Sequence, residues 1–472
     1  MKSVKILVLL LLLVLTQQNV IPRYELEVYF VVDRAVLDRY VAEQTTEDSA
    51  TRGKKAWASL TDDIYYFITE INGLFASLQP KGLNITILKR RVDILDINLF
   101  DDNASSSLAL KAFDDWLASQ GAYTAFAYDA AILWTGHEFL SAGTVNAVGH
   151  AHVGQVCESV NASGIVKYGM TYQVSLNTAH ELGHILGAHH DAYNTGYVMG
   201  AKASPLDTNR WQFSLCSKEI FDFILSKPRS NCLKKTSLDS TVISAGVTDA
   251  LANPDTICRR ASGNRRSFAC KTPSFYGNSG IQGDSVCKRI WCYEVGTKKC
   301  FDTFSSDGLI CGKNHRCNDG TCQDHPDAES AAVDPECFWG DQAEIHVMAR
   351  KGKYVGNCLG LIARDGRSVC YRQAVKMQCC KTCGNFHTGI KGCGYGDIFP
   401  WCHYYDRAMI CHYYKKSCCL FCQGYKRIRS SESSKNVGRV TIDLSSFAIK
   451  VTDELKAIPN EPYVQTPPRE ED

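Results

Sequence analysis

Three histidines near the middle of the chain have the spacing of a metal site. His180 and His184 are four residues apart, so in a helix both imidazoles lie on one face, close enough to bind one ion. Gly187 can adopt a positive φ and end the helix, which brings His190 back as a third ligand. Three neutral nitrogens and one open position are typical of catalytic zinc. The sequence therefore predicts one zinc ion held by His180, His184 and His190.

Glu181 lies beside this set and can supply the proton chemistry that hydrolysis needs. Zinc lowers the pKa of its water towards neutrality, and a nearby carboxylate can take the proton. The alternative is a core helix that carries histidines by chance, but a turn glycine and a glutamate at these offsets would then be coincidences. His189 has the wrong offset for a ligand and is expected at the surface or behind the ligands.

The stretch 180–191 resembles the zinc signature of the metzincin endopeptidases, and Asp191 directly after the third histidine is similar to the adamalysin (reprolysin) branch. That family has a methionine turn beneath the zinc, and residues 197–200 lie at its place, with Met199 as the methionine. Without the resemblance, Met199 would be an ordinary core methionine.

Composition indicates a secreted protein. Of 23 cysteines in 472 residues, only Cys157, Cys216 and Cys232 precede residue 258, which is typical of a globular domain followed by disulfide-rich modules in an oxidising compartment. A basic start and an apolar run predict a signal peptide over residues 1–20. The net charge of +2 does not favour nucleic acid, and no later stretch suits a membrane span. Three sequons are compatible with glycosylation, at Asn84, Asn103 and Asn161.

Alternating strand and helix patterns predict an α/β fold. The metzincin resemblance implies a catalytic domain with a twisted mixed sheet and helices, over residues 21–235. The expected strands cover residues 26–32, 83–95, 128–134 and an edge strand at 147–156. The expected helices cover residues 56–78, 107–119 (with Leu108, Phe113 and Leu117 buried), the zinc helix from about residue 175, and a serine-capped helix through 220–225. This order is also what the metzincin resemblance implies.

The adamalysin resemblance implies a disulfide between Cys157 and Cys232, which leaves Cys216 as a free thiol, an intermolecular link or a bridge to a later module. The family often binds calcium through positions that match Glu27 and Asp129, but the third position falls near Lys235, which cannot ligate a cation. Glu27 and Asp129 are therefore expected either to bind calcium or to make other polar contacts.

Residues 236–256 form a linker or a strip lying against the catalytic domain. Residues 257–325 hold eight cysteines, an even number that favours disulfides over zinc in a secreted chain. The arrangement resembles the disintegrin-like domain of the ADAMTS proteases, a family named for a disintegrin, a metalloprotease and thrombospondin motifs. Because the chain has no Arg-Gly-Asp sequence, integrin binding is not supported.

Two six-cysteine units then form an internal repeat, over residues 337–383 and 393–422. The second is similar to the PLAC module of some ADAMTS proteins, and the first is a looser copy. Such modules contact the extracellular matrix or serve as stable spacers. The polar tail, 423–472, is disordered unless its alternating stretch 440–451 pairs as a strand.

Together these features predict a secreted zinc-dependent metalloendopeptidase that cleaves extracellular or matrix proteins, with Glu181 as general base. The alternative is a catalytically silent, matrix-binding or structural secreted protein that keeps the protease fold. The sequence shows neither the prodomain nor the thrombospondin repeats of full-length ADAMTS enzymes, so we expect latency to come from elsewhere.

Overall fold

The computed structural model describes residues 21–425, apart from 45–47, 142–144, 193–194, 235, 237, 272–283, 298, 313, 326–336 and 338. The predicted signal peptide and residues 426–472 of the predicted tail lie outside the described residues. The chain forms two compact units, residues 1–400 and 401–472. No helix in the described part of the chain is long and apolar enough to cross a membrane.

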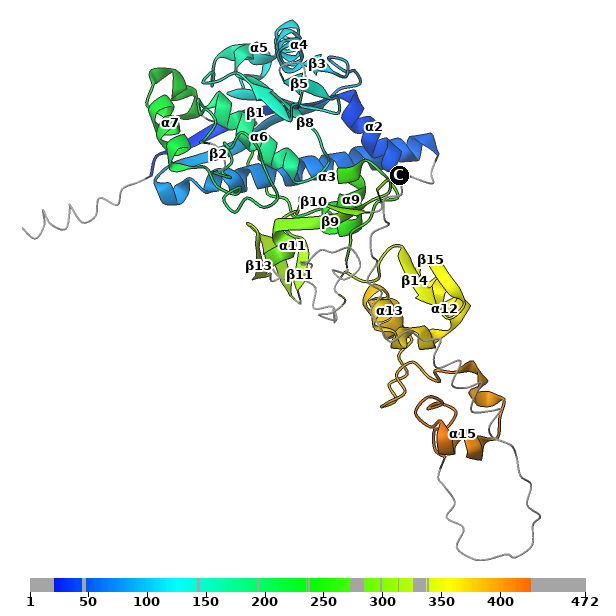
Figure 1. Cartoon of the computed structure of the whole chain (residues 1–472). Coiled ribbons are helices and arrows are strands. Elements are labelled where there is room, and N and C mark those ends of the chain that lie inside the picture. Colours follow the sequence, from blue (N-terminus) through cyan, green and yellow to red (C-terminus); the bar gives the residue numbers. More distant parts are fainter. Residues whose placement is uncertain are drawn as a thin grey trace, which may run out of the picture. The chain divides into compact units, whose positions relative to one another are not determined.

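A five-stranded sheet forms the centre of the N-terminal region, in the order β2-β1-β4-β8-β7 (Figure 1). The strands β2 (Asn84–Ile94), β1 (Arg23–Val32), β4 (Ala130–Thr135) and β8 (Ser163–Lys167) run parallel. The edge strand β7 (Gly149–Ala151) is antiparallel to β8. The two central strands β1 and β4 are mostly buried on both faces, as expected for parallel strands covered by helices, whereas the edge strand β2 carries several polar residues.

Alternating side chains of β1 divide the core into two layers. Val28 and Phe30 belong to the cluster formed with α3 (Ser49–Ala76) and α6 (Gln173–Ile185), whereas Tyr29 and Val31 belong to the cluster formed with α4 (Ser106–Ser119). Figure 1 shows α3 and α6 on one side of the sheet and α4 with α5 (Ala122–Phe126) on the other. This mixed sheet with helices on both faces confirms the predicted α/β class.

Several predicted details were wrong or incomplete. Leu108 is 63% exposed, because it lies five residues before the buried Phe113 and therefore about 140° around the helix. The buried stripe of α4 instead includes Ala109 and Leu110. Strand β8 and helix α2 (Arg34–Glu43) were not predicted. The predicted edge strand at 147–156 pairs only over Gly149–Ala151, since Gly154 and Val156 donate to carbonyl groups at the end of α6.

The described residues of 236–256 lie as a strip against the catalytic domain, which is the second of the two predicted alternatives, and do not form an open linker. Thr241 forms an antiparallel bridge with Lys89 of β2, and Ala245 N–H donates to Thr69 Oγ1 of α3 at 2.8 Å. Thr248 caps α8 (Asp249–Ala252) and also donates to Asp63 of α3 at 2.7 Å. The strip thus joins α3 to the module that follows.

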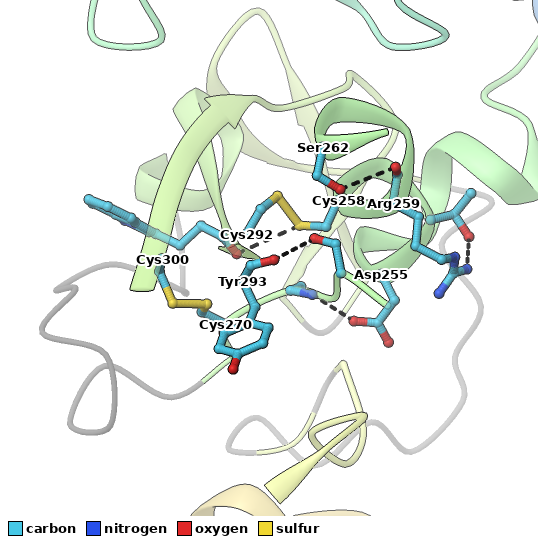
Figure 2. The surroundings of a disulfide bond; sticks show 12 residues. Asp255, Cys258, Arg259, Ser262, Cys270, Cys292, Tyr293 and Cys300 are labelled. Carbon is cyan, nitrogen blue, oxygen red and sulfur yellow. Dashed lines mark hydrogen bonds between the residues drawn. A yellow bond between two sulfur atoms is a disulfide. The ribbon is translucent and has the colours of Figure 1, made fainter. Parts of the chain in front are cut away.

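Disulfides hold that module together. Cys258 on α9 (Pro254–Ser262) is bonded to Cys292 on β9 (Arg289–Glu294), and Cys270 is bonded to Cys300 on β10 (Lys299–Phe304), as Figure 2 shows. Two further bridges, Cys287–Cys317 and Cys311–Cys322, tie in the sheet of β11 (Ile310–Gly312), β12 (His315–Asn318) and β13 (Thr321–Asp324).

The two repeat units share part of their disulfide pattern. In the first, the bridges are Cys337–Cys380, Cys358–Cys379 and Cys370–Cys383. In the second, Cys402–Cys418 and Cys411–Cys422 repeat the pairing of second with fourth and third with sixth cysteine.

The remaining α-helices and strands of the described residues are β3 (Ala104–Ser105), β5 (Phe139–Ser141), β6 (Val145–Asn146), α7 (Leu215–Leu225), α11 (Asp284–Lys288), β14 (Ile345–Ala349), β15 (Gly352–Gly356), α12 (Cys358–Asp365), α13 (Gln373–Gln378), α14 (Cys380–Asn385) and α15 (Arg407–Tyr413).

Candidate metal centre and active site

Helix α6 provides the first two histidines of the site. Most of its residues are buried, and Thr178 accepts a hydrogen bond from the indole of Trp134 in β4 at 2.8 Å. The helix stops at Leu186, and Gly187 follows with φ +100°. A Cβ at Gly187 would also lie 2.7 Å from Ile224 of α7. Only glycine suits this turn, both for its backbone conformation and for space.

The turn brings the three predicted ligands together. His190 Nε2 lies 3.2 Å from His184 Nε2 and 3.2 Å from His180 Nε2. Zinc–nitrogen bonds of about 2.0–2.1 Å in a tetrahedral arrangement place neighbouring nitrogens roughly 3.3 Å apart. His190 Nε2 therefore already lies at the separation from each of the other two nitrogens that a shared zinc ion requires, and all three lie within 4.8 Å of one another.

Backbone carbonyl groups orient two of the rings. His180 Nδ1 lies 2.7 Å from Val198 O, and His184 Nδ1 lies 2.7 Å from Ala188 O. A carbonyl oxygen can only accept, so each Nδ1 carries the proton and each Nε2 presents a lone pair. This arrangement is common for zinc-binding histidines, because the second hydrogen bond holds the tautomer and the ring direction.

Burial keeps the ligands neutral. It lowers the pKa of His180 to about 3 and that of His184 to about 4, and it also lowers the pKa of His190. All three are therefore neutral at pH 7, the state in which imidazole binds a metal. The converging lone pairs repel one another unless a cation lies between them, so the donor set fits zinc.

Met199 lies beneath this site. It is fully buried, and a Cβ at Gly183 of α6 would be 2.4 Å from its sulfur, so helix and methionine turn are in close contact. Asp191 N–H donates to Met199 O at 2.8 Å, and Asp191 Oδ1 accepts from Ser214, the N-cap of α7, at 2.6 Å. Asp191 thus ties the segment that carries His190 to both the turn and α7.

Glu181 is the buried acid of the site. Its side chain lies against Gly149 of β7, where a Cβ would be 2.1 Å from Oε1. Glu181 Oε2 is buried without a hydrogen-bond partner in the described part of the chain. Burial raises its pKa to about 8, and a neighbouring cation would favour the charged form. A buried carboxyl oxygen that lacks a protein partner is well suited to contact water beside a metal.

Other predicted residues lie away from this centre. His189 is exposed and is not part of the histidine cluster. Of the sequon asparagines, Asn103 and Asn161 are exposed and Asn84 is half-buried at the start of β2. Cys157 and Cys232 form a disulfide, and Cys216 is free and exposed on α7.

The two carboxylates considered for calcium have protein partners. Asp129 Oδ2 accepts from the backbone N–H of Glu27 at 2.9 Å, and burial raises the pKa of Asp129 to about 7. The Glu27 carboxylate accepts a hydrogen bond from Ser240 in the strip. These contacts favour the alternative in which both residues serve polar contacts, and Lys235 lies outside the described residues.

The partners that surround the ligands could not be identified from the sequence. The carbonyl groups of Val198 and Ala188 have no side-chain signature, and Gly149 meets Glu181 across 32 positions of the chain. Gly149 did lie within the predicted edge strand, but its contact with the acid depends on how β7 packs on α6.

The chain is similar to known zinc metalloproteases over this region. The profile described as "Reprolysin (M12B) family zinc metalloprotease" matches residues 54–236. "A disintegrin and metalloproteinase with thrombospondin motifs 1" from Rattus norvegicus is 25% identical over 227 residues, covering 45% of this chain and 22% of that protein. "A disintegrin and metalloproteinase with thrombospondin motifs 8" from Homo sapiens is 26% identical, covering 43% of this chain and 24% of that protein. The chain spans less than a quarter of the length of these two relatives.

Among solved structures, metalloproteinase-II from Bacteroides fragilis matches with 18% identity and a TM-score of 0.31, over 43% of this chain and 54% of that one. A TM-score this low does not bear on the fold. The profile match instead coincides with the histidine cluster and the methionine turn that the structure assembles. Residues 54–236 are thus a reprolysin (M12B) family zinc metalloprotease domain.

Proposed function

We propose that this protein is a secreted zinc-dependent endopeptidase that cleaves extended segments of extracellular proteins. The observation that carries this proposal is the convergence of three neutral imidazole nitrogens at 3.2 Å beside a buried, unpartnered oxygen of Glu181. The described part of the chain holds at least ten disulfides, nine of them beyond residue 257, which supports an extracellular location because such bridges persist in oxidising compartments.

His180, His184 and His190 would hold the zinc ion. When bound, zinc acidifies a water molecule and polarises the carbonyl of the scissile peptide bond. Glu181 takes a proton from the attacking water and then delivers it to the leaving amine. The buried position of Glu181 excludes bulk water from this transfer, and its contact with Gly149 limits the directions in which the carboxylate can turn.

The edge strand β7 is the expected binding place for the substrate. Lys167 N–H donates to Val148 O, and His152 N–H donates to Ser163 O. Hydrogen bonding to one neighbour alternates along an antiparallel strand, so the N–H and C=O groups of Gly149 and Ala151 point away from β8. An extended peptide could pair with this free edge, as peptides do when they add a strand to a sheet.

Other parts of the proposal rest on resemblance or composition. Matrix contacts through the two repeat units, glycosylation at Asn84, Asn103 and Asn161, and calcium at Glu27 and Asp129 remain predictions. None of them is needed for the zinc chemistry.

A Glu181→Ala variant tests the mechanism. We expect it to keep one zinc per chain and to lose roughly 10²–10⁴-fold in kcat, the usual contribution of a general base. Glu219→Ala, which removes an exposed acid on α7, is the matched control and should cleave like the wild type. Cleavage of a general protein substrate, with zinc measured by metal analysis, gives both readouts.

Chelation separates the proposal from its alternative. Cleavage by the wild type should stop when zinc is removed and return when zinc is restored. If the wild type binds zinc but shows no chelator-sensitive cleavage, the protein is a silent relative that keeps the fold. If Glu181→Ala cleaves as fast as the wild type, the assigned base is wrong.

A further inference from the structure

We propose that Asp114 of α4 is a positioning residue for substrate binding, holding the edge strand β7 in the place where an extended peptide pairs with it. This inference rests on the proposed function. Asp114 is 15% exposed and lies on the side of α4 that faces the sheet edge. Asp114 does not contact the histidine cluster, and a peptide paired with β7 would not contact Asp114.

Two segments of chain meet on the Asp114 carboxylate. His152, the residue directly after β7, donates from Nε2 to Asp114 Oδ2 at 2.8 Å. Ser163, the first residue of β8, donates its hydroxyl to Asp114 Oδ1. Both carboxylate oxygens are therefore used, one for each strand. Hydrogen bonds to a charged acceptor are stronger than bonds between neutral groups, so the carboxylate fixes the end of β7 relative to β8.

A second histidine of this segment contacts α4 about two helical turns closer to the start of that helix. His150 Nδ1 lies 2.9 Å from Ser106 Oγ at the start of α4. His150 and His152 are two residues apart, so their side chains project from the same face of the strand. Ser106 and Asp114 are eight residues apart, so they lie on the same side of the helix. The two histidines thus fasten β7 along its length to α4.

The opposite face of β7 lies on the catalytic helix. Gly149 packs against Glu181, and Ala151 packs against Gly164 of β8, whose Cβ would be 3.0 Å from that of Ala151. Because glycine and alanine have no polar side chains on this face, the polar side-chain contacts that hold the strand, in addition to its backbone hydrogen bonds, are those of the two histidines with α4. The backbone groups of Gly149 and Ala151 that point away from β8 are the ones a substrate would use.

A short strand needs such support. β7 has three residues, is paired on one side only, and precedes the turn at Gly154. Edge strands with few ladder bonds move more easily than central strands. Removal of the Asp114 carboxylate would leave His152 and Ser163 without their shared acceptor and would let the end of β7 shift.

The test compares neighbouring acids on the same helix. Asp114→Ala removes the contact, Asp114→Asn keeps the shape and one acceptor oxygen, and Asp115→Ala is the matched control. Asp115 is 66% exposed and pairs only with Lys111 at the surface among the described contacts. Each variant is made in the full chain and loaded with zinc, and its zinc content and thermal unfolding midpoint are measured first.

We expect Asp114→Ala to raise KM for an extended peptide by about 3–10-fold, the range for the loss of one or two hydrogen bonds, and to change kcat less. Inhibition by acetohydroxamate, which reaches only the metal, should stay within about 2-fold of the wild type, whereas a peptidyl hydroxamate should weaken by the same factor as KM. Asp114→Asn should recover part of the loss, and Asp115→Ala should behave as the wild type.

Equal KM values for Asp114→Ala and Asp115→Ala would overturn the inference. So would an equal loss for both hydroxamates, because that result would indicate general damage to the metal site. These outcomes differ from failure of the proposed function, which appears as full activity in Glu181→Ala or as no zinc-dependent cleavage in the wild type.

Discussion

Two of the three zinc-facing nitrogens, those of His180 and His184, are set by the hydrogen bond that the ring makes through its other nitrogen. The Nδ1 atoms of His180 and His184 donate to carbonyl groups on the methionine turn and on the segment just after α6. Because a carbonyl group cannot donate, these contacts allow one tautomer only. His190 comes from the segment that Asp191 fastens to Met199 and Ser214. The neighbouring His189 is exposed and is not part of the histidine cluster.

The two adjacent histidines therefore differ sharply in their effect on the metal. His190→Ala leaves two nitrogen ligands, and we expect zinc affinity to fall by more than about 100-fold, the upper range for loss of a residue that only hydrogen bonds to a ligand. His189→Ala should bind zinc as the wild type does. Competition with a chromogenic zinc chelator measures both, and equal affinities for the two variants would contradict the assigned ligand set.

Among the elements, α9 makes a buried ion-pair contact between the disulfide module and the catalytic domain. The side chain of Arg260 on α9 is 1% exposed and donates to Asp63 of α3 at 2.8 Å and to Glu43 of α2 at 2.8 and 3.0 Å. Asp63 also accepts from Tyr40 at 2.6 Å and from Thr248 at 2.7 Å. Burial lowers the pKa of Arg260, but Tyr40, Glu43 and Asp63 together raise it above its ordinary value. The buried Asp63 is thus paired with a residue from the next module.

Arg260→Ala should destabilise the chain by about 3–5 kcal/mol, because it leaves the buried Asp63 charge without its partner. Arg259→Ala is the control, since Arg259 is only half-buried and bonds within its own helix, to Thr256. Thermal and urea unfolding of the full chain measure the difference. A loss no larger than that of Arg259→Ala would show that Asp63 does not rely on this pair.

At the scale of residues 1–400, the catalytic domain and the disulfide module meet around a cavity of about 350 Å³, lined by Tyr66, Glu70, Asp307 and Arg316 among others. Tyr66 donates to Asp307 O at 3.1 Å, and Arg210, from the segment after the methionine turn, donates to Lys288 O at 2.5 Å. The carboxyl groups of Glu70 and Asp307 both line this cavity. Burial and a neighbouring carboxylate both disfavour the charged form of an acid.

The stability of this contact should therefore fall as the pH rises. Burial, with Asp307 and Asp319 nearby, raises the pKa of Glu70, and burial with Asp319 raises that of Asp307 to about 6. The folded protein then binds more protons than the unfolded chain above about pH 4, so the free energy of unfolding decreases with pH through the folded pKa values. Glu70→Gln should flatten this slope between pH 5 and pH 8.

The unfolding midpoint measured across that pH range tests the sign. Other buried acids, such as Glu181 and Asp129, contribute in the same direction, so the difference between wild type and Glu70→Gln isolates the effect of Glu70. Asp62→Asn, at an exposed position of the same helix, should leave the slope unchanged. A slope in Glu70→Gln as steep as that of the wild type would contradict the raised pKa of Glu70.

The zinc ligands could be predicted from the sequence because their geometry is local. A separation of four residues on a helix and a turn glycine place His180, His184 and His190 without reference to distant parts of the chain. Strong apolar periodicity likewise indicated α3 and β1, and the cysteine distribution indicated disulfide-rich modules. The resemblance to adamalysins added the pair Cys157–Cys232, which the structure joins.

Only the tertiary structure decided which distant groups meet. The contact of Gly149 with Glu181, the attachment of β7 to α4 through Asp114, and the seating of Arg260 on Asp63 each join residues far apart in sequence. Leu108 shows the same limit, since the exposed side of α4 was determined by its packing on the sheet. Local spacing determines how a helix presents its own residues, whereas contacts between elements depend on the packing of the whole core.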